Sequence, residues 1–389
     1  MRSKTFCILI AVGSAIAILV ALPASAKNFR VLHSFNYIDG CNPSAGVIGD
    51  SQGNLYGTTD YGAAYRSGLV FKLDRAGREI GLHNFGAFPS DGAVPDDSLV
   101  RDNRGNLYGN TILGGAFGSG IAFKLDAAGN ETVLHNFAGG PIDGAPPEGL
   151  IQDNKGNLYG TTFYDGPYGY GLAFKLTANG HDTILYGFKG GAQVANPNGP
   201  LTRDDDGNLY GTSVNGGIYN AGTVFKLTPY GELSVLYSFK GLPLEAVPSG
   251  GVVRDAESNL YGTTVYGGNS SCYDGCGTVF KINPNGEEAV LYVFHGKDGQ
   301  TPNSGLIRDE RGKLYGTTYY SGGTGRDANA GTVFELSSTG RETVLHKFTG
   351  GNDGSNPESG LFRDAEGNLY GTTFGGGAHV CGTVFRITP

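Results

Sequence analysis

Apolar residues in this chain occur in short runs, separated by glycine, proline, asparagine and aspartate. Residues 149–188 illustrate the pattern, with β-favouring runs at 149–151, 157–162, 171–176 and 183–188. None of these runs has an apolar period long enough for a helix, and runs of this length between turn-forming residues are typical of β-strands. We therefore predict four strands in this segment and name them A to D in chain order.

The same pattern recurs along the chain at a nearly constant interval. A motif close to Gly-Asn-Leu-Tyr-Gly-Thr-Thr appears seven times, and its tyrosines are Tyr56, Tyr108, Tyr159, Tyr210, Tyr261, Tyr315 and Tyr370. Their spacings of 52, 51, 51, 51, 54 and 55 residues indicate repeated supersecondary units. Seven repeats of four antiparallel strands around a ring predict an all-β, seven-bladed β-propeller, with residues 27–389 as its single domain.

The two ends of the chain carry complementary parts of one repeat. Residues 29–35 match strand D, and residues 382–387 match strand C. A chain of this kind completes its last blade only if its two ends pair, which also removes the open edges of a linear array. Cys41 follows the first D strand and Cys381 precedes the last C strand, so this pairing predicts a Cys41–Cys381 disulfide.

A second disulfide is predicted within one loop. Cys272 and Cys276 enclose only three residues, where a local bond is geometrically easy. Zinc binding by all four cysteines is the alternative, but the two pairs belong to different blades. Paired thiols fit an exported protein, because disulfides persist in oxidising compartments.

The N-terminus predicts export. Residues 1–26 have a basic start, an apolar run over 6–22 and the small-residue cleavage site Ala24-Ser25-Ala26, which together are typical of a signal peptide. An uncleaved membrane anchor is the alternative, but this run is at the short edge for a spanning helix. We expect a secreted monomer, extracellular or periplasmic, with no membrane span in the mature chain.

The charge of the chain argues against nucleic-acid binding. Cleavage after residue 26 removes Arg2 and Lys4 and takes the formal net charge from −8 to −10. An acidic surface repels phosphate backbones, and the repeats contain no cluster of arginine or lysine. We therefore expect no nucleic-acid partner.

An aspartate opens each predicted A–B turn, and a glycine follows three residues later except where Ser258 stands in its place. Aspartate can accept backbone hydrogen bonds across such a turn while glycine takes a positive φ. A calcium loop is the alternative, but one constant carboxylate per turn offers too few oxygen ligands. We predict a structural role for these aspartates.

One column of strand D holds histidine in four repeats and tyrosine in three: His33, His83, His135, His346, Tyr186, Tyr237 and Tyr292. A position that accepts either residue within one molecule is predicted to serve packing or hydrogen bonding. The sequence therefore gives this column no metal role.

The B–C and D–A loops share one face of such a propeller, and most variation between the repeats lies there. In most repeats the B–C loop carries an aromatic ring shortly before strand C, and a flat ring can stack on the C–H face of a sugar. Packing of these rings between blades is the alternative. The candidate ligand-binding residues are Tyr65, Phe117, Tyr168, Tyr219, Tyr273 and His379.

A proline column leads each D–A loop into strand A, and the residues after it should point to the central channel. Carboxylates and amides that converge on an axis could hold Ca²⁺, or they could line a water-filled channel mouth. The candidate channel residues are Asp96, Asp97, Glu148, Asn198, Asn303 and Glu358. The sequence contains no nucleophile elbow, phosphate loop or His-Glu-x-x-His motif, so we predict no catalytic residue.

The motif Gly-Asn-Leu-Tyr-Gly-Thr-Thr, followed in register by Gly-Thr-Val-Phe-Lys-Leu, resembles the GloVer tandem-repeat proteins of bacteria across nearly all of residues 27–389. That resemblance implies a secreted or surface-anchored β-propeller and no shared activity. The end of the chain at Pro389, without an anchor tail, favours free secretion or the periplasm. The turn motif is more distantly similar to NHL and gluconolactonase-type propellers. Their metal-dependent enzymes carry acidic and amide ligands at the channel, but no residue-by-residue match exists here.

These observations lead to one main functional hypothesis. It is an exported binding module that recognises a glycan or another extracellular protein on the face of the B–C and D–A loops. The first alternative is a metal-assisted lyase or lactonase at the channel mouth. The second is a structural cell-surface protein.

Overall fold

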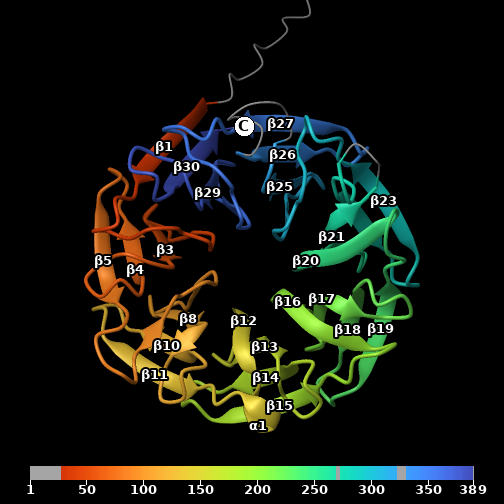
Figure 1. Cartoon of the computed structure of the whole chain (residues 1–389), viewed down its shortest axis with the longest axis horizontal. Coiled ribbons are helices and arrows are strands. Elements are labelled where there is room, and N and C mark those ends of the chain that lie inside the picture. The colour runs from red at the N-terminus through yellow and green to blue at the C-terminus, as the bar shows by residue number, and fades with distance from the viewer. Residues whose placement is uncertain (1–27, 269–271, 322–329, 389) are drawn as a thin grey trace, which may run out of the picture.

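The computed structural model describes residues 28–268, 272–321 and 330–388. Seven four-stranded antiparallel sheets surround a central axis, which confirms the predicted seven-bladed propeller (Figure 1). The predicted signal peptide, residues 1–26, lies outside the described residues. Within them the one helix is the short α1 (Gly140–Asp143), and no helix is long and apolar enough to span a membrane.

The strands of each blade run in order from the channel to the rim. Blades 1 to 3 consist of β2 (Ile48–Gly49), β3 (Leu55–Thr59), β4 (Leu69–Leu73) and β5 (Glu79–Asn84); β7 (Val100–Arg101), β8 (Leu107–Thr111), β10 (Ile121–Leu125) and β11 (Glu131–Asn136); and β12 (Ala145–Gln152), β13 (Leu158–Tyr164), β14 (Leu172–Leu176) and β15 (Asp182–Gly187). The loops of blade 2 add a small sheet of β6 (Gly92–Ala93) and β9 (Leu113–Gly114).

The remaining four blades repeat this order. Blades 4 and 5 consist of β16 (Val194–Arg203), β17 (Leu209–Gly216), β18 (Thr223–Leu227) and β19 (Leu233–Ser238), and of β20 (Glu245–Arg254), β21 (Leu260–Gly267), β22 (Thr278–Ile282) and β23 (Glu288–Val293). Blades 6 and 7 consist of β24 (Ile307–Arg308), β25 (Leu314–Thr318), β26 (Thr332–Leu336) and β27 (Glu342–Lys347), and of β28 (Phe362–Arg363), β29 (Leu369–Thr373), β30 (Thr383–Thr388) and β1 (Asn28–Ser34).

The innermost strand is longer in blades 3 to 5 than the sequence indicated. The prediction placed strand A of blade 3 at 149–151, whereas β12 covers eight residues because its pairing with β13 continues from Gln152 as far as Ala145, opposite Tyr164. In blades 1, 2, 6 and 7 the corresponding strand has only two residues.

The ring closes as predicted. Strand β1 pairs antiparallel with β30, so the first and last strands of the domain complete blade 7 (Figure 1). Cys41 and Cys381 are bonded across this closure, with their Cα atoms 4.5 Å apart, and Cys272 is bonded to Cys276. Both predicted disulfides are therefore present, and the bonded cysteines offer no thiolates for the alternative zinc site.

A phenylalanine pair joins each blade to the next. The phenylalanine that follows strand D is at most 1% exposed and packs against the phenylalanine of strand C in the following blade, with ring centroids 5.0–5.4 Å apart. This edge-to-face contact is favourable for aromatic rings. The pairs are Phe35–Phe71, Phe85–Phe123, Phe137–Phe174, Phe188–Phe225, Phe239–Phe280, Phe294–Phe334 and Phe348–Phe385.

The glycine of the Leu-Tyr-Gly-Thr motif is explained by this contact. A Cβ atom on Gly57 would lie 2.7 Å from Cζ of Phe71, which is on the neighbouring strand of the same blade. That distance is too short for two carbon atoms in van der Waals contact. Glycine therefore leaves the space that the inter-blade ring occupies.

The aspartate of the A–B turn organises the remainder of the motif. Asp102 accepts hydrogen bonds from the backbone N–H groups of Arg104 and Asn106, from the Asn106 side-chain amide and from the Tyr108 hydroxyl, at 2.7–3.1 Å. Partial burial acts to raise the pKa of Asp102, but the hydrogen bonds prevail and the pKa is lowered. The tyrosine-to-aspartate bond recurs in all seven repeats, which confirms the predicted structural role.

Replacement of this aspartate should destabilise the domain more than replacement of a similar one elsewhere in the blade. Asp102→Ala leaves the partly buried Tyr108 hydroxyl and the turn amides without their acceptor, so the free energy of unfolding should fall by about 1–3 kcal/mol in chemical denaturation. Asp126 in the C–D turn accepts only from Ala128 and Asn130 and has no tyrosine partner, which makes Asp126→Ala the matched control with a smaller loss. Equal losses would contradict this assignment.

Candidate functional site

Exposed hydrophobic side chains gather on one face of the ring. Among the described residues, all but six of the exposed large hydrophobic side chains lie in the B–C and D–A loops, which share that face. Tyr164 and Tyr266 lie at the ends of β13 and β21 that lead into B–C loops. The other exceptions are Ile80, Ile184 and Val290 on outer strands, and Tyr230 in a C–D turn at the opposite end of its blade. Exposed apolar groups concentrated in this way are typical of an interaction surface.

Four of the predicted ligand-binding aromatics form a row across consecutive blades. Tyr65, Phe117, Tyr168 and Tyr219 occupy equivalent positions in blades 1 to 4 and are 53%, 62%, 53% and 58% exposed. We call these four residues the aromatic row. Lys189 Nζ lies 5.5 Å from the centroid of the Tyr168 ring. Because these side chains are exposed, packing between blades does not account for them.

The other two predicted ligand residues are exposed but lie on different blades. Tyr273 is fully exposed in the loop closed by the Cys272–Cys276 disulfide of blade 5, and His379 is exposed in blade 7. The aromatic row therefore has two isolated neighbours on the same face, not a closed ring of seven.

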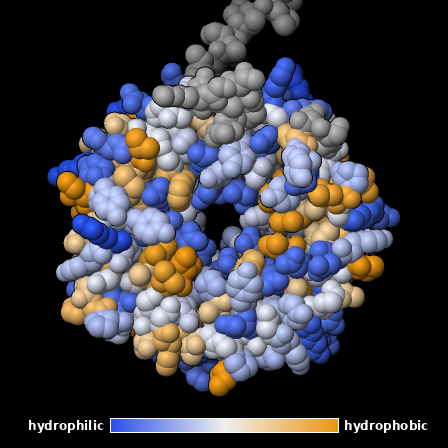
Figure 2. Space-filling model, in the orientation of Figure 1, coloured by the Kyte–Doolittle hydropathy of each residue, from blue (hydrophilic) through white to orange (hydrophobic). Residues whose placement is uncertain are grey.

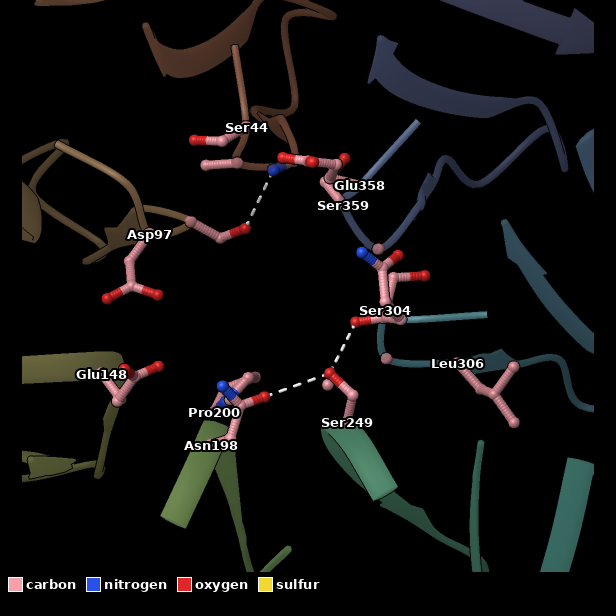
Figure 3. A pocket seen from close by; sticks show the side chains of 18 of the residues that line it. Ser44, Asp97, Glu148, Asn198, Pro200, Ser249, Ser304, Leu306, Glu358 and Ser359 are labelled. Atoms are coloured by element: carbon pink, nitrogen blue, oxygen red, sulfur yellow. Dashed lines mark hydrogen bonds between the residues drawn. The ribbon is translucent and has the colours of Figure 1, made fainter. Parts of the chain in front are cut away.

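A cavity of about 460 Å³ occupies the channel mouth. All six predicted channel residues line it: Asp96, Asp97, Glu148, Asn198, Asn303 and Glu358. Figure 2 shows the hollow of the channel at the centre of the ring, and Figure 3 shows the side chains of Asp97 and Glu148 next to each other on one side of it. The structure thus places all six predicted side chains around one cavity.

The channel carboxyls have raised pKa values. Burial, with the charge of Asp96 as the next cause, raises the pKa of Asp60 to about 8 and the pKa values of Asp97 and Glu358 to about 7. Burial raises the pKa of Glu148 well above its usual value, and the charges of Asp97 and Asp96 add to this shift. The cluster therefore binds protons at a pH where isolated carboxyls are ionised.

Amide and hydroxyl groups complete the lining. Ser249 Oγ donates to Asn198 Oδ1 at 3.1 Å and lies 2.9 Å from the backbone oxygen of Asn303 (Figure 3). The Oδ1 atoms of Asn110 and Asn303 are buried and accept no hydrogen bond from any described residue. Unused oxygen acceptors beside carboxylates are the kind of ligand that a hard cation such as Ca²⁺ prefers.

Sequence reasoning missed Asp60. It is 6% exposed, follows β3 and accepts a hydrogen bond from the Ser44 hydroxyl at the channel mouth. The equivalent position holds Ile112, Phe163, Val214, Val265, Tyr319 and Phe374 in the other repeats. Asp60 could have been identified from the sequence, because it is the only carboxylate at a repeat position that otherwise holds apolar or aromatic residues.

Comparison with known families decides what kind of protein this is. The model of the Gloeobacter/Verrucomicrobia repeat matches residues 16–162 and 196–389, which is most of the chain. The chain belongs to the Gloeobacter/Verrucomicrobia repeat family. This confirms the resemblance inferred from the repeat motifs. No curated protein gives a significant sequence match.

Solved structures share the fold of this repeat protein at low sequence identity. Two extracellular domains assigned to hybrid two-component systems of B. thetaiotaomicron superpose with TM-scores of 0.58 and 0.59 at 14% and 12% identity. The matches cover 93% and 92% of this chain but only 41% and 39% of those proteins, so the chain spans about two fifths of their length. A gluconolactonase of Xanthomonas campestris has 16% identity and a TM-score of 0.43, with 90% and 88% of the two chains covered.

The raised pKa values of the channel predict how the stability of the repeat protein depends on pH. The unfolded carboxyls have pKa values near 4, so the native state holds more protons from about pH 4 up to pH 7 or 8. Stability that is fully present below this window is lost as the pH rises through it. The double variant Asp97→Asn/Glu148→Gln lacks two of these carboxyls, so its stability should fall less as the pH rises. Its free energy of unfolding at pH 8 should exceed that of the wild type by on the order of 1–2 kcal/mol, allowing for screening by channel water.

The measurement is the thermal midpoint of both proteins from pH 4 to pH 8. The two midpoints should approach each other at the acidic end of the range, where the native carboxyls are protonated and the unfolded ones become so. Parallel curves would show that the channel carboxyls do not titrate in this window.

Proposed function

We propose that this protein is an exported binding module that recognises a glycan through the aromatic row. The observation that carries the proposal is the concentration of exposed apolar side chains on the B–C and D–A loop face, with one solvent-facing ring in each of four consecutive blades. Rings at equivalent positions of a repeating scaffold suit a ligand that itself repeats, such as a polysaccharide. The wide exposure of the rings suits an extended ligand better than a small molecule, which would require a deep pocket.

Export is supported independently of the ligand. The chain carries two disulfides, which persist in oxidising compartments, and an N-terminal segment with the features of a signal peptide. The extracellular domains from B. thetaiotaomicron have the same fold. An extracellular or periplasmic location follows from these features taken together.

A glycan fits the loop face better than an extracellular protein does. Protein interfaces usually bury a continuous apolar centre, whereas the rings here alternate with glycine-rich loops and polar groups. Tyrosine rings offer an apolar face and a hydroxyl, which match the C–H face and the hydroxyl groups of a pyranose. An extracellular protein as the ligand is the other outcome that the same variants can detect.

The test is binding of soluble polysaccharides to the mature protein, first on a glycan array and then by calorimetry with the best hit. Tyr168→Ala and Tyr219→Ala should each weaken binding about tenfold or more, as expected when about 1.4 kcal/mol of stacking is lost. Tyr230→Ala is the matched control, because Tyr230 is 91% exposed but lies in a C–D turn outside this face.

Two results would overturn the glycan proposal. One is the absence of any hit on the array, and the other is binding that the two row variants leave unchanged. Capture of a purified surface protein that depends on Tyr168 and Tyr219 would instead assign the face to a protein ligand.

A second candidate function is cation binding at the channel mouth. The neighbouring carboxyls Asp97 and Glu148, which line the cavity and have raised pKa values, favour it, together with the unused Oδ1 atom of Asn303 in the same lining. A bound Ca²⁺ would displace the protons and offset the repulsion between these carboxylates. Lyase or lactonase chemistry at the channel would require this cation first.

Calcium should therefore raise the thermal midpoint of metal-stripped protein by several degrees at pH 8 and by much less at pH 5, where protons compete. The double variant Asp97→Asn/Glu148→Gln should lose the response. A midpoint that calcium does not change at either pH would exclude a calcium site at the channel mouth.

A further inference from the structure

Histidines on the outer strands meet carboxylates at three consecutive blade interfaces. In each case the histidine comes from strand D of one blade, a first aspartate from the D–A loop that follows it, and a second carboxylate from the start of strand D in the next blade. The three sets are His33 with Asp39 and Glu79, His83 with Asp91 and Glu131, and His135 with Asp143 and Asp182.

The second and third sets are compact enough to hold one ion. In each of them the imidazole nitrogen and one oxygen from each carboxylate all lie within 4.8 Å of one another. His83 Nε2 is 3.4 Å from Asp91 Oδ1 and 3.8 Å from Glu131 Oε1. Zinc bonds of about 2.0–2.2 Å in a tetrahedron place neighbouring ligand atoms roughly 3.3–3.6 Å apart, so a small adjustment of Glu131 would complete the geometry.

Each compact set also contains a carboxylate oxygen with no other use. Glu131 Oε1 and Asp182 Oδ1 are buried and accept no hydrogen bond from any described residue. A carboxylate oxygen that is buried without a hydrogen bond costs free energy, and a bound cation would remove that cost.

The other ligands are held in place by neighbouring groups. Asp91 accepts the backbone N–H of Ala87, and the His83 ring packs edge-on against Phe85 with centroids 4.7 Å apart. Supporting contacts of this kind fix the orientation of metal ligands. In the third set Asp143 accepts the backbone N–H of Ala138, and the His135 ring packs edge-on against Phe137 in the same way.

Other interfaces of the same ring lack the full set. Between blades 3 and 4, Tyr186 hydrogen-bonds to Gln193, and Leu233 stands where the second carboxylate would be. Between blades 6 and 7, His346 bonds to Asp353, but Phe29 occupies the carboxylate position and stacks on the imidazole at 3.7 Å. Histidine and both carboxylates therefore coincide at neighbouring interfaces on one side of the ring.

We propose that the His83–Asp91–Glu131 and His135–Asp143–Asp182 sets are two zinc-binding sites that link adjacent blades. One imidazole nitrogen and two carboxylate oxygens form a ligand set suited to Zn²⁺ and similar divalent transition ions. Two ionised carboxylates balance the charge of the ion. Three protein ligands leave the fourth position to water, which fits the partial exposure of His83 and His135, 18% and 19% for their side chains.

The alternation of histidine and tyrosine in this column predicts a packing or hydrogen-bonding role, and the contacts of His83 with Asp91 and of His135 with Asp143 agree with hydrogen bonding. A metal site extends that role and does not depend on the proposed glycan function. Each site draws on two blades, so a bound ion would oppose their separation and add to stability as any native-state ligand does.

The test measures zinc content and affinity in the untagged mature chain. Metal-stripped protein titrated with Zn²⁺ should bind two ions, and the thermal midpoint should rise. His83→Tyr and His135→Tyr should each remove one ion, and the double variant should bind neither. Tyrosine is chosen because this column holds tyrosine in three other blades, so these variants are expected to fold. Glu131→Gln provides a second, smaller change that should weaken its site at least tenfold.

His346→Tyr is the matched control, because that interface lacks the second carboxylate and should leave both ions bound. The channel variant Asp97→Asn/Glu148→Gln should also leave both ions bound, which separates this proposal from calcium binding at the channel. Failure of the wild-type chain to bind Zn²⁺ would overturn the proposal, as would zinc binding that the His83 and His135 variants do not change. Either result would identify the sets as hydrogen-bonded networks only.

Discussion

The edge-to-face phenylalanine pair between neighbouring blades is the contact on which this structure depends. It is fully buried and occurs at every interface, including the two that involve blade 7. The rest of each repeat accommodates it: glycine leaves space for the ring, and the tyrosine-to-aspartate bond fixes the turn before that glycine. Closure by β1 and β30 is needed because the Phe348–Phe385 pair requires a complete seventh blade.

Because every interface is built in the same way, chemical differences between the blades stand out as departures from the repeat. At the channel mouth, blades 1, 2, 3 and 7 contribute carboxyl groups, whereas blades 4, 5 and 6 contribute Asn198, Ser249 and Asn303. Burial raises the pKa values of Asp97 and Glu148, and repulsion from neighbouring carboxylates adds to the shift. Their ionised forms are disfavoured in the native state, and groups with pKa values perturbed in this way are typical of functional sites.

The sequence predicted the architecture because each element of the repeat is local. The order of strands within a blade, the Asp102 turn and the Cys41–Cys381 closure all follow from residues close in the sequence or from the repeat register. What it could not predict depends on side chains from different blades. The contact of His83 with Glu131 requires knowing how far the second blade is rotated against the first, and the long β12 requires knowing that its loop residues keep pairing with β13. The exposure of the aromatic row depends on the same tertiary packing.

The position of the His–carboxylate sets relative to the phenylalanine pairs bears on their role. His83 is two residues before Phe85, whose ring packs on Phe123 of the next blade, so the set and the hydrophobic contact lie at one interface. Interfaces with tyrosine or with Phe29 in place of a ligand keep the phenylalanine pair, which shows that the ring does not require the histidine set in order to close. At the interface of blades 5 and 6, Tyr292 stands in the histidine column and hydrogen-bonds to Asp298, with Glu342 at the second carboxylate position, so paired carboxylates also occur without a histidine. The two compact sets differ by the imidazole nitrogen beside both carboxylates, which adds the third ligand that a zinc ion would need.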